Sequence, residues 1–351
     1  MNIKISKNVE FGYDKPPVII AEISSNHGGS KEKFLKLIDQ AYDNGADLVK
    51  IQTYEPEDIT FNSDLKPFII KNGLWKGKNL WNLYKKACTP YSWHEDAFKL
   101  AKKRNKILFS TPFSNRALIF LKSFSPKIFK ISSFEITDLY LVKMIAKTRK
   151  PIILSTGVST AKEINEAMKI IYKFHKKIIL LHCVSSYPTS LSDANINRVN
   201  FLKKEFNKHL IGLSDHTRGL TSSLSATALG VVAIEKHVKL NNNSITEDSE
   251  FSIPLKDLRV LKEETKNIFI SLGIGKINKK ISDNDKKNLI YRRSIYAKKN
   301  LNKNDIITEK NIKTLRPSIG IPANKFFKII GMRLKKNINA DEPIYQKNLE
   351  K

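Results

Sequence analysis

The chain has 351 residues, of which 62 are Lys or Arg and 34 are Asp or Glu, so its formal net charge is +28. This length allows a large core and about two domains, and 41% hydrophobic residues is usual for a soluble globule. No run of 18 apolar residues occurs, so we expect no membrane span. The charge raises nucleic-acid binding as an alternative function. The lysines are dispersed and no aromatic-basic module accompanies them, so we expect a solvated surface and no nucleic-acid partner.

The N-terminal residues lack the apolar core of a signal peptide. Cys88 and Cys183 are widely separated and do not have the spacing of metal ligands. We therefore expect two free thiols in a reducing cytoplasm.

Eight apolar runs, each ending in polar residues, follow one another along the first two thirds of the chain. Runs of this kind are typical of buried parallel strands, and amphipathic helical stretches separate most of them. The alternation predicts a (β/α)8 TIM barrel. A doubly wound dinucleotide fold is disfavoured, because no Gly-x-Gly-x-x-Gly follows the first run. The eight runs are residues 18–24, 47–53, 106–112, 128–134, 151–157, 178–184, 210–216 and 231–238.

The second and third runs are separated by residues 54–105, which is too long for a single helix. This insertion contains several aromatic residues, among them Trp75, Trp81, Tyr84 and Trp93. Long insertions after a barrel strand lie at the catalytic face and shape substrate pockets. The alternative, that these aromatics form the core of an extra helical hairpin, has equal weight.

The pattern changes after Gly275. We expect a barrel domain at residues 1–275, a lysine-rich linker at 276–293 and a small β-rich domain at 294–351. The last segment contains a weak repeat, with KKNLN at 298–302 and KKNIN at 335–339, each followed by KNI or KNL. A domain this small is expected to dock onto something larger.

Two histidines, His216 and His237, end successive strands. A single crossover helix at 220–229 joins these strands, so they should be neighbours in the sheet. Two adjacent imidazoles, with the carboxylates Asp215 and Glu235 close by, suit a divalent metal that keeps positions open for water and substrate. The alternative is two unrelated histidines in loops.

Polar side chains recur at the ends of the other strands. Lysines and hydroxyls that converge on one barrel mouth form an anion pocket, because each donates hydrogen bonds to oxygen, and phosphate is its natural occupant. A Schiff-base aldolase that uses Lys50 or Lys130 and no metal is an alternative. The side chains at the strand ends are Glu22, Lys50, Gln52, Ser110, Thr111, Lys130, Ser133, Glu135, Ser155, His182, Ser185, Tyr187, Ser214, His216, Glu235 and His237.

Together, four of these segments resemble the sialic acid synthase family. They are AEISSNH at 21–27, GADLVKIQT at 45–53, GLSDH at 212–216 and IEKH at 234–237. The resemblance covers nearly the whole chain, and its last 60 or so residues are similar to that family's antifreeze-like (SAF) domain. It implies condensation of phosphoenolpyruvate with a six-carbon amino sugar to give a nonulosonic acid, with release of phosphate by carbon–oxygen cleavage.

Within the family, the insertion is most similar to the pseudaminic acid synthase branch. GLW at 73–75, NLWNLY at 79–84 and TPYSWH at 89–94 carry this similarity. Gly28 and Ser185 stand where relatives often carry Asn, and Ser185 fits the pseudaminate branch. The alternatives are the N-acetylneuraminate and legionaminate branches.

The resemblance also implies a role for each candidate residue. His216 and His237 would hold Mn²⁺, with Mg²⁺ or Co²⁺ as alternatives, and Glu22 would contact the enolpyruvate or a catalytic water. The phosphate of phosphoenolpyruvate would be bound by Lys50, Thr111, Lys130, Ser133, Ser155 and Ser214. The sugar would be bound by Gln52, Glu135, Tyr187 and Asp248, and by Arg316 from the partner subunit of a domain-swapped homodimer.

Overall fold

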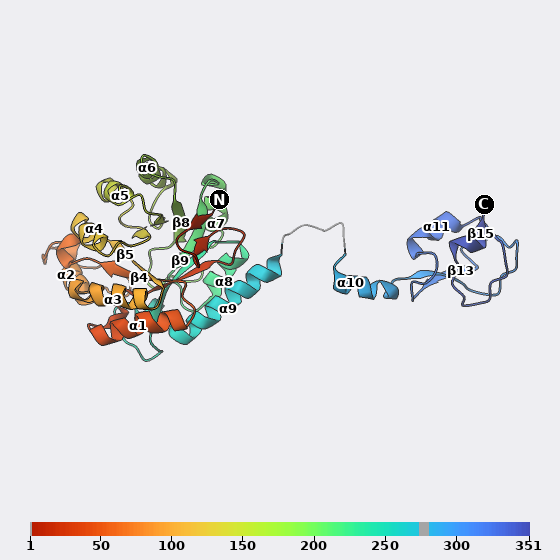
Figure 1. Cartoon of the computed structure of the whole chain (residues 1–351), viewed down its shortest axis with the longest axis horizontal. Coiled ribbons are helices and arrows are strands. Elements are labelled where there is room, and N and C mark those ends of the chain that lie inside the picture. Colours follow the sequence, from red (N-terminus) through yellow and green to blue (C-terminus); the bar gives the residue numbers. More distant parts are fainter. Residues whose placement is uncertain (1, 274–280) are drawn as a thin grey trace. The chain divides into compact units, whose positions relative to one another are not determined.

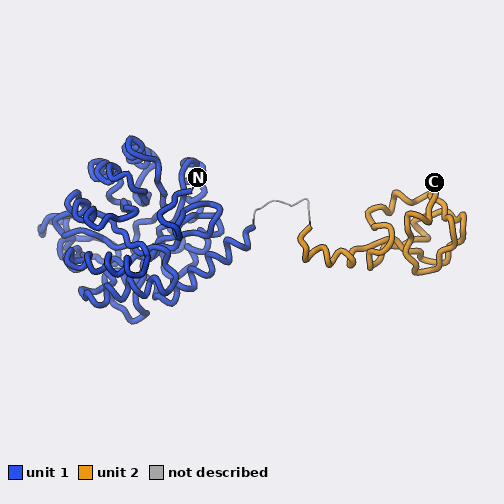
Figure 2. Tube along the Cα trace, in the orientation of Figure 1, with its two compact units in different colours: residues 1–273 blue, residues 274–351 orange. Residues whose placement is uncertain are grey.

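The computed structural model describes residues 2–273 and 281–351. The chain divides into two compact units, residues 1–273 and 274–351 (Figure 2). Of the predicted linker, residues 276–280 lie outside the described residues. The remainder contains the short helix α10 (Asp283–Lys287) and a 3-10 helix at Asn288–Tyr291.

Unit 1 is a parallel eight-stranded barrel surrounded by helices (Figure 1), which confirms the predicted fold class. The strand order is β5-β4-β3-β10-β9-β8-β7-β6, and the end strands β5 and β6 lie next to each other, so the barrel nearly closes. All eight predicted runs form strands. They are β3 (Val18–Glu22), β4 (Leu48–Thr53), β5 (Ile107–Pro112), β6 (Phe129–Ile131), β7 (Ile152–Ser155), β8 (Ile178–Cys183), β9 (Leu210–Asp215) and β10 (Ala233–Lys239), which also pairs with β11 (Ile253–Pro254).

The helices pack their apolar faces onto the strands. In α1, for example, Phe34, Leu37, Ile38 and Ala41 are fully buried, as the helical spacing of these residues predicts. Side-chain caps begin several of these helices. The helices of unit 1 are α1 (Lys31–Asp43), α2 (Leu80–Ala87), α3 (Tyr91–Lys103), α4 (Asn115–Lys122), α5 (Leu139–Ala146), α6 (Ala161–Tyr172), α7 (Arg198–Glu205), α8 (Thr221–Ala228) and α9 (Leu255–Leu272).

A short N-terminal hairpin covers the amino end of the barrel. Its strands are β1 (Ile3–Lys4) and β2 (Glu10–Phe11). Ile3, Val9 and Phe11 pack against barrel residues such as Ile20 and Phe109. The sequence patterns did not predict this hairpin, because two-residue strands carry no periodicity. It fills one end of the barrel with apolar side chains, so the polar strand ends lie at the other.

The insertion after β4 divides into two parts. Its last part, α3, lies beside α1 as an ordinary barrel helix, and Trp93 packs against Phe34 with ring centroids 5.6 Å apart. The residues between Thr53 and α3 contain short 3-10 turns and α2. The pocket interpretation therefore holds for Trp75 and Tyr84, which line a cavity, while Trp93 packs in the ordinary helical layer of the barrel.

Unit 2 has a small core of its own, built from short strands and the one-turn helix α11 (Phe326–Ile329). The two repeats make equivalent hydrogen bonds. Leu301 and Ile338 exchange backbone bonds of 2.8 and 2.9 Å, and the N–H groups of Lys298 and Lys335 donate to corresponding carbonyls further along each repeat. The strands are β12 (Ser294–Ala297), β13 (Ile312–Leu315), β14 (Arg333–Leu334) and β15 (Leu349–Glu350).

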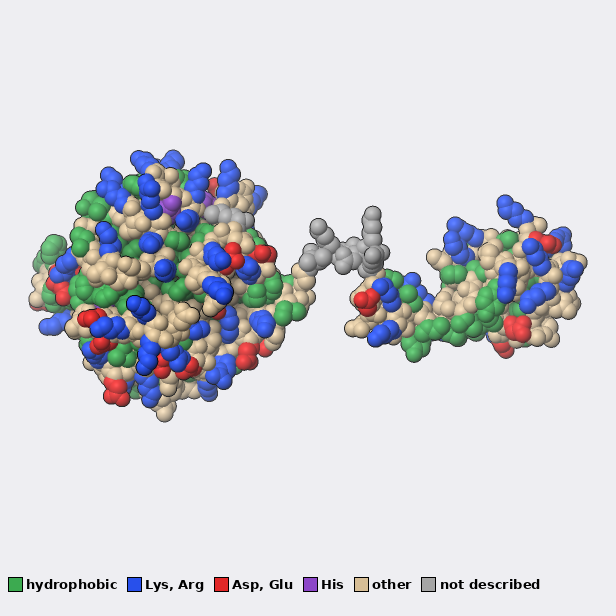
Figure 3. All heavy atoms as spheres, in the orientation of Figure 1, with side chains coloured by type: hydrophobic (Ala, Val, Ile, Leu, Met, Phe, Trp, Pro, Cys, Tyr) green, Lys and Arg blue, Asp and Glu red, His purple; other side chains and the backbone are tan. Residues whose placement is uncertain are grey.

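The lysine and arginine side chains are scattered over the visible face of each unit and do not form one basic patch (Figure 3). This agrees with the interpretation of the charge as solvated surface. Within residues 2–273 and 281–351, no helix combines the length and the apolar composition needed to cross a membrane.

Candidate active site

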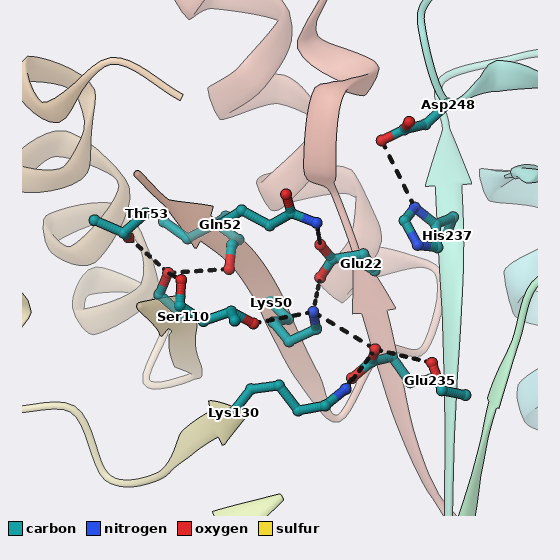
Figure 4. A network of polar contacts seen from close by, with 12 residues as sticks. Glu22, Lys50, Gln52, Thr53, Ser110, Lys130, Glu235, His237 and Asp248 are labelled. Carbon is teal, nitrogen blue, oxygen red and sulfur yellow. Dashed lines mark hydrogen bonds and ion pairs between the residues drawn. The ribbon is translucent and has the colours of Figure 1, made fainter. Parts of the chain in front are cut away.

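Four charged side chains meet inside the barrel, at the carboxyl ends of β3, β4, β6 and β10 (Figure 4). They are Glu22, Lys50, Lys130 and Glu235, and each is at most 4% exposed. Lys50 Nζ lies 2.9 Å from Glu22 Oε2 and 3.5 Å from Glu235 Oε1, and Lys130 Nζ lies 2.8 Å from both oxygens of Glu235. Buried charges are costly unless they are paired, and here the signs alternate along the network.

The two carboxylates in this charge network differ in protonation. Burial raises the pKa of Glu22 well above its ordinary value, Lys50 opposes this shift, and the neighbouring Glu235 adds to it. Burial acts on Glu235 too, but the ammonium groups of Lys130 and Lys50 outweigh it and lower the pKa of Glu235. Glu235 is therefore the permanent counter-ion of the lysines, while Glu22 can exchange a proton near neutral pH.

Hydroxyl and amide groups adjoin the charge network. Lys50 Nζ donates to Thr111 Oγ1 at 3.4 Å, and Ser214 Oγ donates to Glu235 Oε1 at 3.2 Å. Gln52 Nε2 donates to Glu22 Oε1 at 3.1 Å. These contacts bring together residues that the sequence analysis placed in one anion pocket.

Two further serines of the predicted phosphate set lie at the ends of β6 and β7. Ser133 Oγ is 2.8 Å from Ser185 Oγ, and Ser155 Oγ is buried without a hydrogen-bond partner in the part of the chain that the structure describes. A Cβ at Gly157 would lie 2.4 Å from Ser185 Oγ and 3.1 Å from Ser133 Cβ. Only glycine therefore leaves room between these hydroxyls, which suits close approach of an anion.

The two histidines are adjacent, with ring centroids 5.4 Å apart and both side chains buried. His216 Nδ1 is 2.8 Å from the carbonyl oxygen of Val184. Because a carbonyl only accepts, Nδ1 carries a proton, and Nε2 is the nitrogen that can bind a cation when the ring is neutral. Burial lowers the pKa of His216, but the neighbouring Cys183 thiol and the Val184 carbonyl outweigh it and raise the pKa. His237 Nδ1 lies 4.0 Å from Asp248 Oδ2 and has no hydrogen-bond partner among the described residues. Burial, with nearby cationic groups, holds the pKa of His237 well below its ordinary value, so this ring is neutral.

Two adjacent imidazoles, each of which offers a ring nitrogen when it is neutral, fit a divalent cation. Residues 2–273 and 281–351 contain no group of three or more His, Cys, Asp or Glu side chains arranged for a metal, so water and substrate would complete the coordination. The carboxylates Asp215 and Glu235, which the sequence placed close to the histidines, are each paired with a lysine. Asp215 pairs with Lys236 at 2.9 Å and Glu235 pairs with Lys130, so both carboxylates are already engaged.

A cavity of about 690 Å³ opens beside these residues. The predicted sugar-binding residues Gln52, Glu135, Tyr187 and Asp248 line it together with His237. Burial raises the pKa of Glu135 to about 7. The rest of the wall is largely apolar and aromatic, and much of it comes from the insertion. These residues are Tyr54, Ile59, Ile70, Leu74, Trp75, Leu80, Leu83, Tyr84, Ala87, Phe113, Phe134 and Phe251.

Trp75 is fixed above this cavity. Its Nε1–H donates to the carbonyl of Glu247 at 3.1 Å, and its ring lies 5.6 Å from that of Tyr187 and 6.2 Å from that of Phe251. This hydrogen bond attaches the insertion to the loop that carries Asp248. Trp81, on α2, is not among the residues that line the cavity in the described part of the chain.

The sequence analysis missed some residues of the site, and one residue that it assigned, Arg316, belongs to unit 2. Glu235 had no assigned partner, although its spacing of two from His237 puts both on the inner face of β10. Phe251 and Glu247 follow β10 in an irregular loop that carries no periodic signal. Arg316 is exposed in unit 2, directly after β13. Its predicted role therefore stays a prediction.

The fold and this site define a TIM-barrel enzyme with a small C-terminal domain and a polar mouth suited to an anionic substrate. The NeuB family matches residues 37–277 and the SAF domain matches residues 292–350. The chain belongs to the NeuB family, which confirms the resemblance to sialic acid synthases.

Full-length relatives agree with this assignment. The chain is 40% identical to the pseudaminic acid synthase of Campylobacter jejuni subsp. jejuni serotype O:23/36 (strain 81-176), over 95% of this chain and 97% of the relative. It is 39% identical to the pseudaminic acid synthase of Helicobacter pylori (strain ATCC 700392 / 26695), over 96% and 99% of the two chains. The solved N-acetylneuraminic acid synthetase of Leptospira borgpetersenii superimposes with a TM-score of 0.73 at 33% identity, covering 82% of this chain and 95% of that one.

Proposed function

We propose that the chain is a pseudaminic acid synthase. It condenses phosphoenolpyruvate and water with 2,4-diacetamido-2,4,6-trideoxy-L-altrose, giving pseudaminic acid and inorganic phosphate. The observation that carries the reaction is the charge network, in which two buried ammonium groups lie beside two adjacent imidazoles at the barrel mouth. The names of the relatives and the aromatic wall of the cavity support the choice of sugar.

Lys50 and Lys130 bind the phosphate of phosphoenolpyruvate. The hydroxyls of Thr111, Ser133, Ser155 and Ser214 donate further hydrogen bonds to it. The phosphate competes with Glu22 and Glu235 for the ammonium groups, and it does so well because a dianion attracts them more strongly than one carboxylate. The same contacts stabilise inorganic phosphate as the leaving group. The bond that breaks is therefore the one between carbon and the bridging oxygen.

His216 and His237 hold the cation, which we take to be Mn²⁺, with Mg²⁺ or Co²⁺ as alternatives. When bound, such an ion supplies Lewis acidity for the sugar carbonyl. His237 contributes a neutral ring, and His216 is oriented by its Nδ1 contact with the Val184 carbonyl.

Glu22 accepts the proton of the water that adds to the reacting carbon. After the enol carbon attacks the sugar carbonyl, positive charge develops at the carbon that bears the phosphate, and water adds there. A carboxylate with a raised pKa accepts the proton of that water and stabilises the charge meanwhile. Gln52 holds Glu22 in place through its 3.1 Å hydrogen bond.

Gln52, Glu135, Tyr187 and Asp248 bind the polar groups of the sugar, since they line the cavity. The apolar wall accommodates the methyl group of a 6-deoxy sugar, where N-acetylmannosamine has a hydroxymethyl group. We also propose a homodimer in which the partner's C-terminal domain supplies Arg316 over the sugar and excludes water from the reacting carbon.

Isotope labelling tests the reaction. Phosphoenolpyruvate with ¹⁸O in its bridging oxygen should yield labelled phosphate and unlabelled sugar acid. Label in the sugar acid would contradict carbon–oxygen cleavage. EDTA should abolish turnover and Mn²⁺ should restore it, whereas a lysine adduct trapped by borohydride would favour the Schiff-base aldolase instead.

A further inference from the structure

A second ion pair lies directly behind the two histidines. Side chains alternate between the two faces of a strand, so Ser214 and Glu235 point into the barrel while Asp215 and Lys236 point outward. Asp215 and Lys236 are register partners on β9 and β10, and their side chains are 2.9 Å apart. They are 1% and 0% exposed, respectively.

Asp215 is saturated with donors. Besides Lys236, its carboxylate accepts hydrogen bonds from Thr217 N at 2.8 Å, from Thr217 Oγ1 at 2.7 Å and from Ser223 Oγ of α8 at 2.6 Å. Lys236 Nζ also donates to the carbonyl of Thr217. The ion pair thus joins the residues on both sides of His216 to the residue that precedes His237.

The backbone of His216 is held from its other side too. Its carbonyl accepts a hydrogen bond from Thr189 N at 3.0 Å, and Val184 fixes its ring nitrogen. His216 lies just beyond the last residue of β9, where an isolated parallel bridge between Thr189 and Thr217 follows the continuous ladder. The side-chain contacts made by the two neighbours of His216 add to this backbone pairing.

A buried ion pair adds little net stability, because desolvating both charges offsets their attraction. Its contribution here is geometric. We propose that Asp215 and Lys236 are positioning residues, which hold His216 and His237 at the separation that binds the divalent cation. This inference rests on the metal role given to the histidines in the proposed function.

Mn²⁺ binding by metal-free, full-length protein tests the inference, with the electron paramagnetic resonance signal of free Mn²⁺ as the readout. The variant Asp215→Asn/Lys236→Met removes both charges at once, so neither is left buried and unpaired. We expect it to keep the circular dichroism spectra of the wild type and to bind Mn²⁺ about 10–100-fold more weakly, as is typical when outer contacts of metal ligands are lost.

The matched control is Asp47→Asn/Lys262→Met. This pair, 2.6 Å apart, joins the start of β4 to α9 at the amino end of the barrel. Its removal should leave Mn²⁺ affinity within about twofold of the wild type, since it touches neither histidine segment. Equal weakening in both variants would mean that loss of stability, not positioning, lowers the affinity, and would overturn the inference.

Ser223→Ala provides a milder variant in case the double variant does not fold. It removes one hydrogen bond to Asp215 and keeps the ion pair, so we expect Mn²⁺ to bind about threefold or more weakly. If the folded Asp215→Asn/Lys236→Met protein binds Mn²⁺ with wild-type affinity, the positioning role is overturned. If that variant does not fold, wild-type affinity in Ser223→Ala overturns it. Neither result bears on the metal role of the histidines. Failure of the wild type itself to bind Mn²⁺ would refute the metal role and the inference together.

Discussion

Glu235 holds the ammonium group of Lys130 with both of its carboxylate oxygens, each 2.8 Å from Nζ. The same carboxylate lies 3.5 Å from Lys50 Nζ, so one anion serves two cations. This carboxylate opposes the effect of burial on both lysines: the pKa of Lys50 is raised above its ordinary value, whereas burial still lowers the pKa of Lys130. The arrangement also means that a bound phosphate draws on cations already positioned, with little reorganisation of the protein.

Replacement of Lys130 by Met should raise the KM for phosphoenolpyruvate at least tenfold and change the KM for the sugar much less. A charge-assisted hydrogen bond contributes about 1.5–3 kcal/mol, which is the origin of this magnitude. Steady-state kinetics with each substrate varied in turn measures both constants. Lys143→Met removes the same charge from the exposed face of α5 and should change neither. A change confined to the sugar constant would mean that Lys130 does not bind the phosphate.

Trp75 should determine the choice of sugar. Trp75→Ala removes the aromatic wall fixed to Glu247, and it should raise the KM for the 6-deoxy sugar about tenfold or more, because a large apolar contact is lost. The KM for N-acetylmannosamine, which gains little from that apolar wall, should change less. Trp81→Ala is the matched control, since Trp81 comes from the same insertion without lining the cavity. Equal effects of the two variants would contradict a specific role for Trp75.

Glu135 should make stability depend on pH. Burial raises its pKa to about 7 in the folded protein from 4.5, so the folded state holds the proton more tightly than the unfolded chain. The contribution of Glu135 to stability therefore falls as the pH rises from about 4.5 to about 7. Glu135→Gln should be more stable than the wild type at pH 8, by at most about 3 kcal/mol, and nearly equal to it at pH 4.5.

Urea unfolding at the two pH values measures this difference. Glu263→Gln, at an exposed position on α9, controls for the loss of one carboxylate from a strongly cationic chain. If Glu135→Gln shifts the unfolding midpoint by the same amount at both pH values, the carboxyl group does not have a raised pKa.

The strands and the adjacent histidines could be predicted from local patterns. Each barrel strand lies within an apolar run that ends in polar residues, and a single crossover helix places β9 beside β10 whatever the rest of the chain does. The pairing of Lys130 with Glu235 could not be predicted in this way. These residues lie 105 positions apart on strands that are not neighbours, so only closure of the barrel brings them together.

The outward direction of Asp215 was missed for a different reason. Its position between Ser214 and His216 placed it close to the expected metal site, yet strand alternation turns it to the outer face, where Lys236 balances its charge. The alternation was visible in the sequence. The partner was not, because a buried lysine is unusual and carries no periodic signal.

The partner's C-terminal domain should complete each active site. His216→Ala and Arg316→Ala should each inactivate a homodimer, for the two sites are equivalent. When the two variants are unfolded and refolded together in equal amounts, half of the dimers should be mixed and carry one intact site. Roughly a quarter of wild-type activity should therefore return. Differently tagged chains allow the mixed dimers to be isolated and assayed. Mixed dimers without activity would show that Arg316 acts within its own subunit, and an active Arg316→Ala homodimer would show that Arg316 takes no part in the reaction.

The sugar specificity is best tested by phosphate release with phosphoenolpyruvate, Mn²⁺ and one amino sugar at a time. The candidates are 2,4-diacetamido-2,4,6-trideoxy-L-altrose, N-acetylmannosamine and the corresponding precursor of legionaminic acid. We predict the highest kcat/KM for the altrose derivative, at least tenfold above the others, since its 6-methyl group meets the apolar wall of Trp75 and Tyr84. Equal or faster phosphate release with N-acetylmannosamine or the legionaminate precursor would contradict the assignment as a pseudaminic acid synthase.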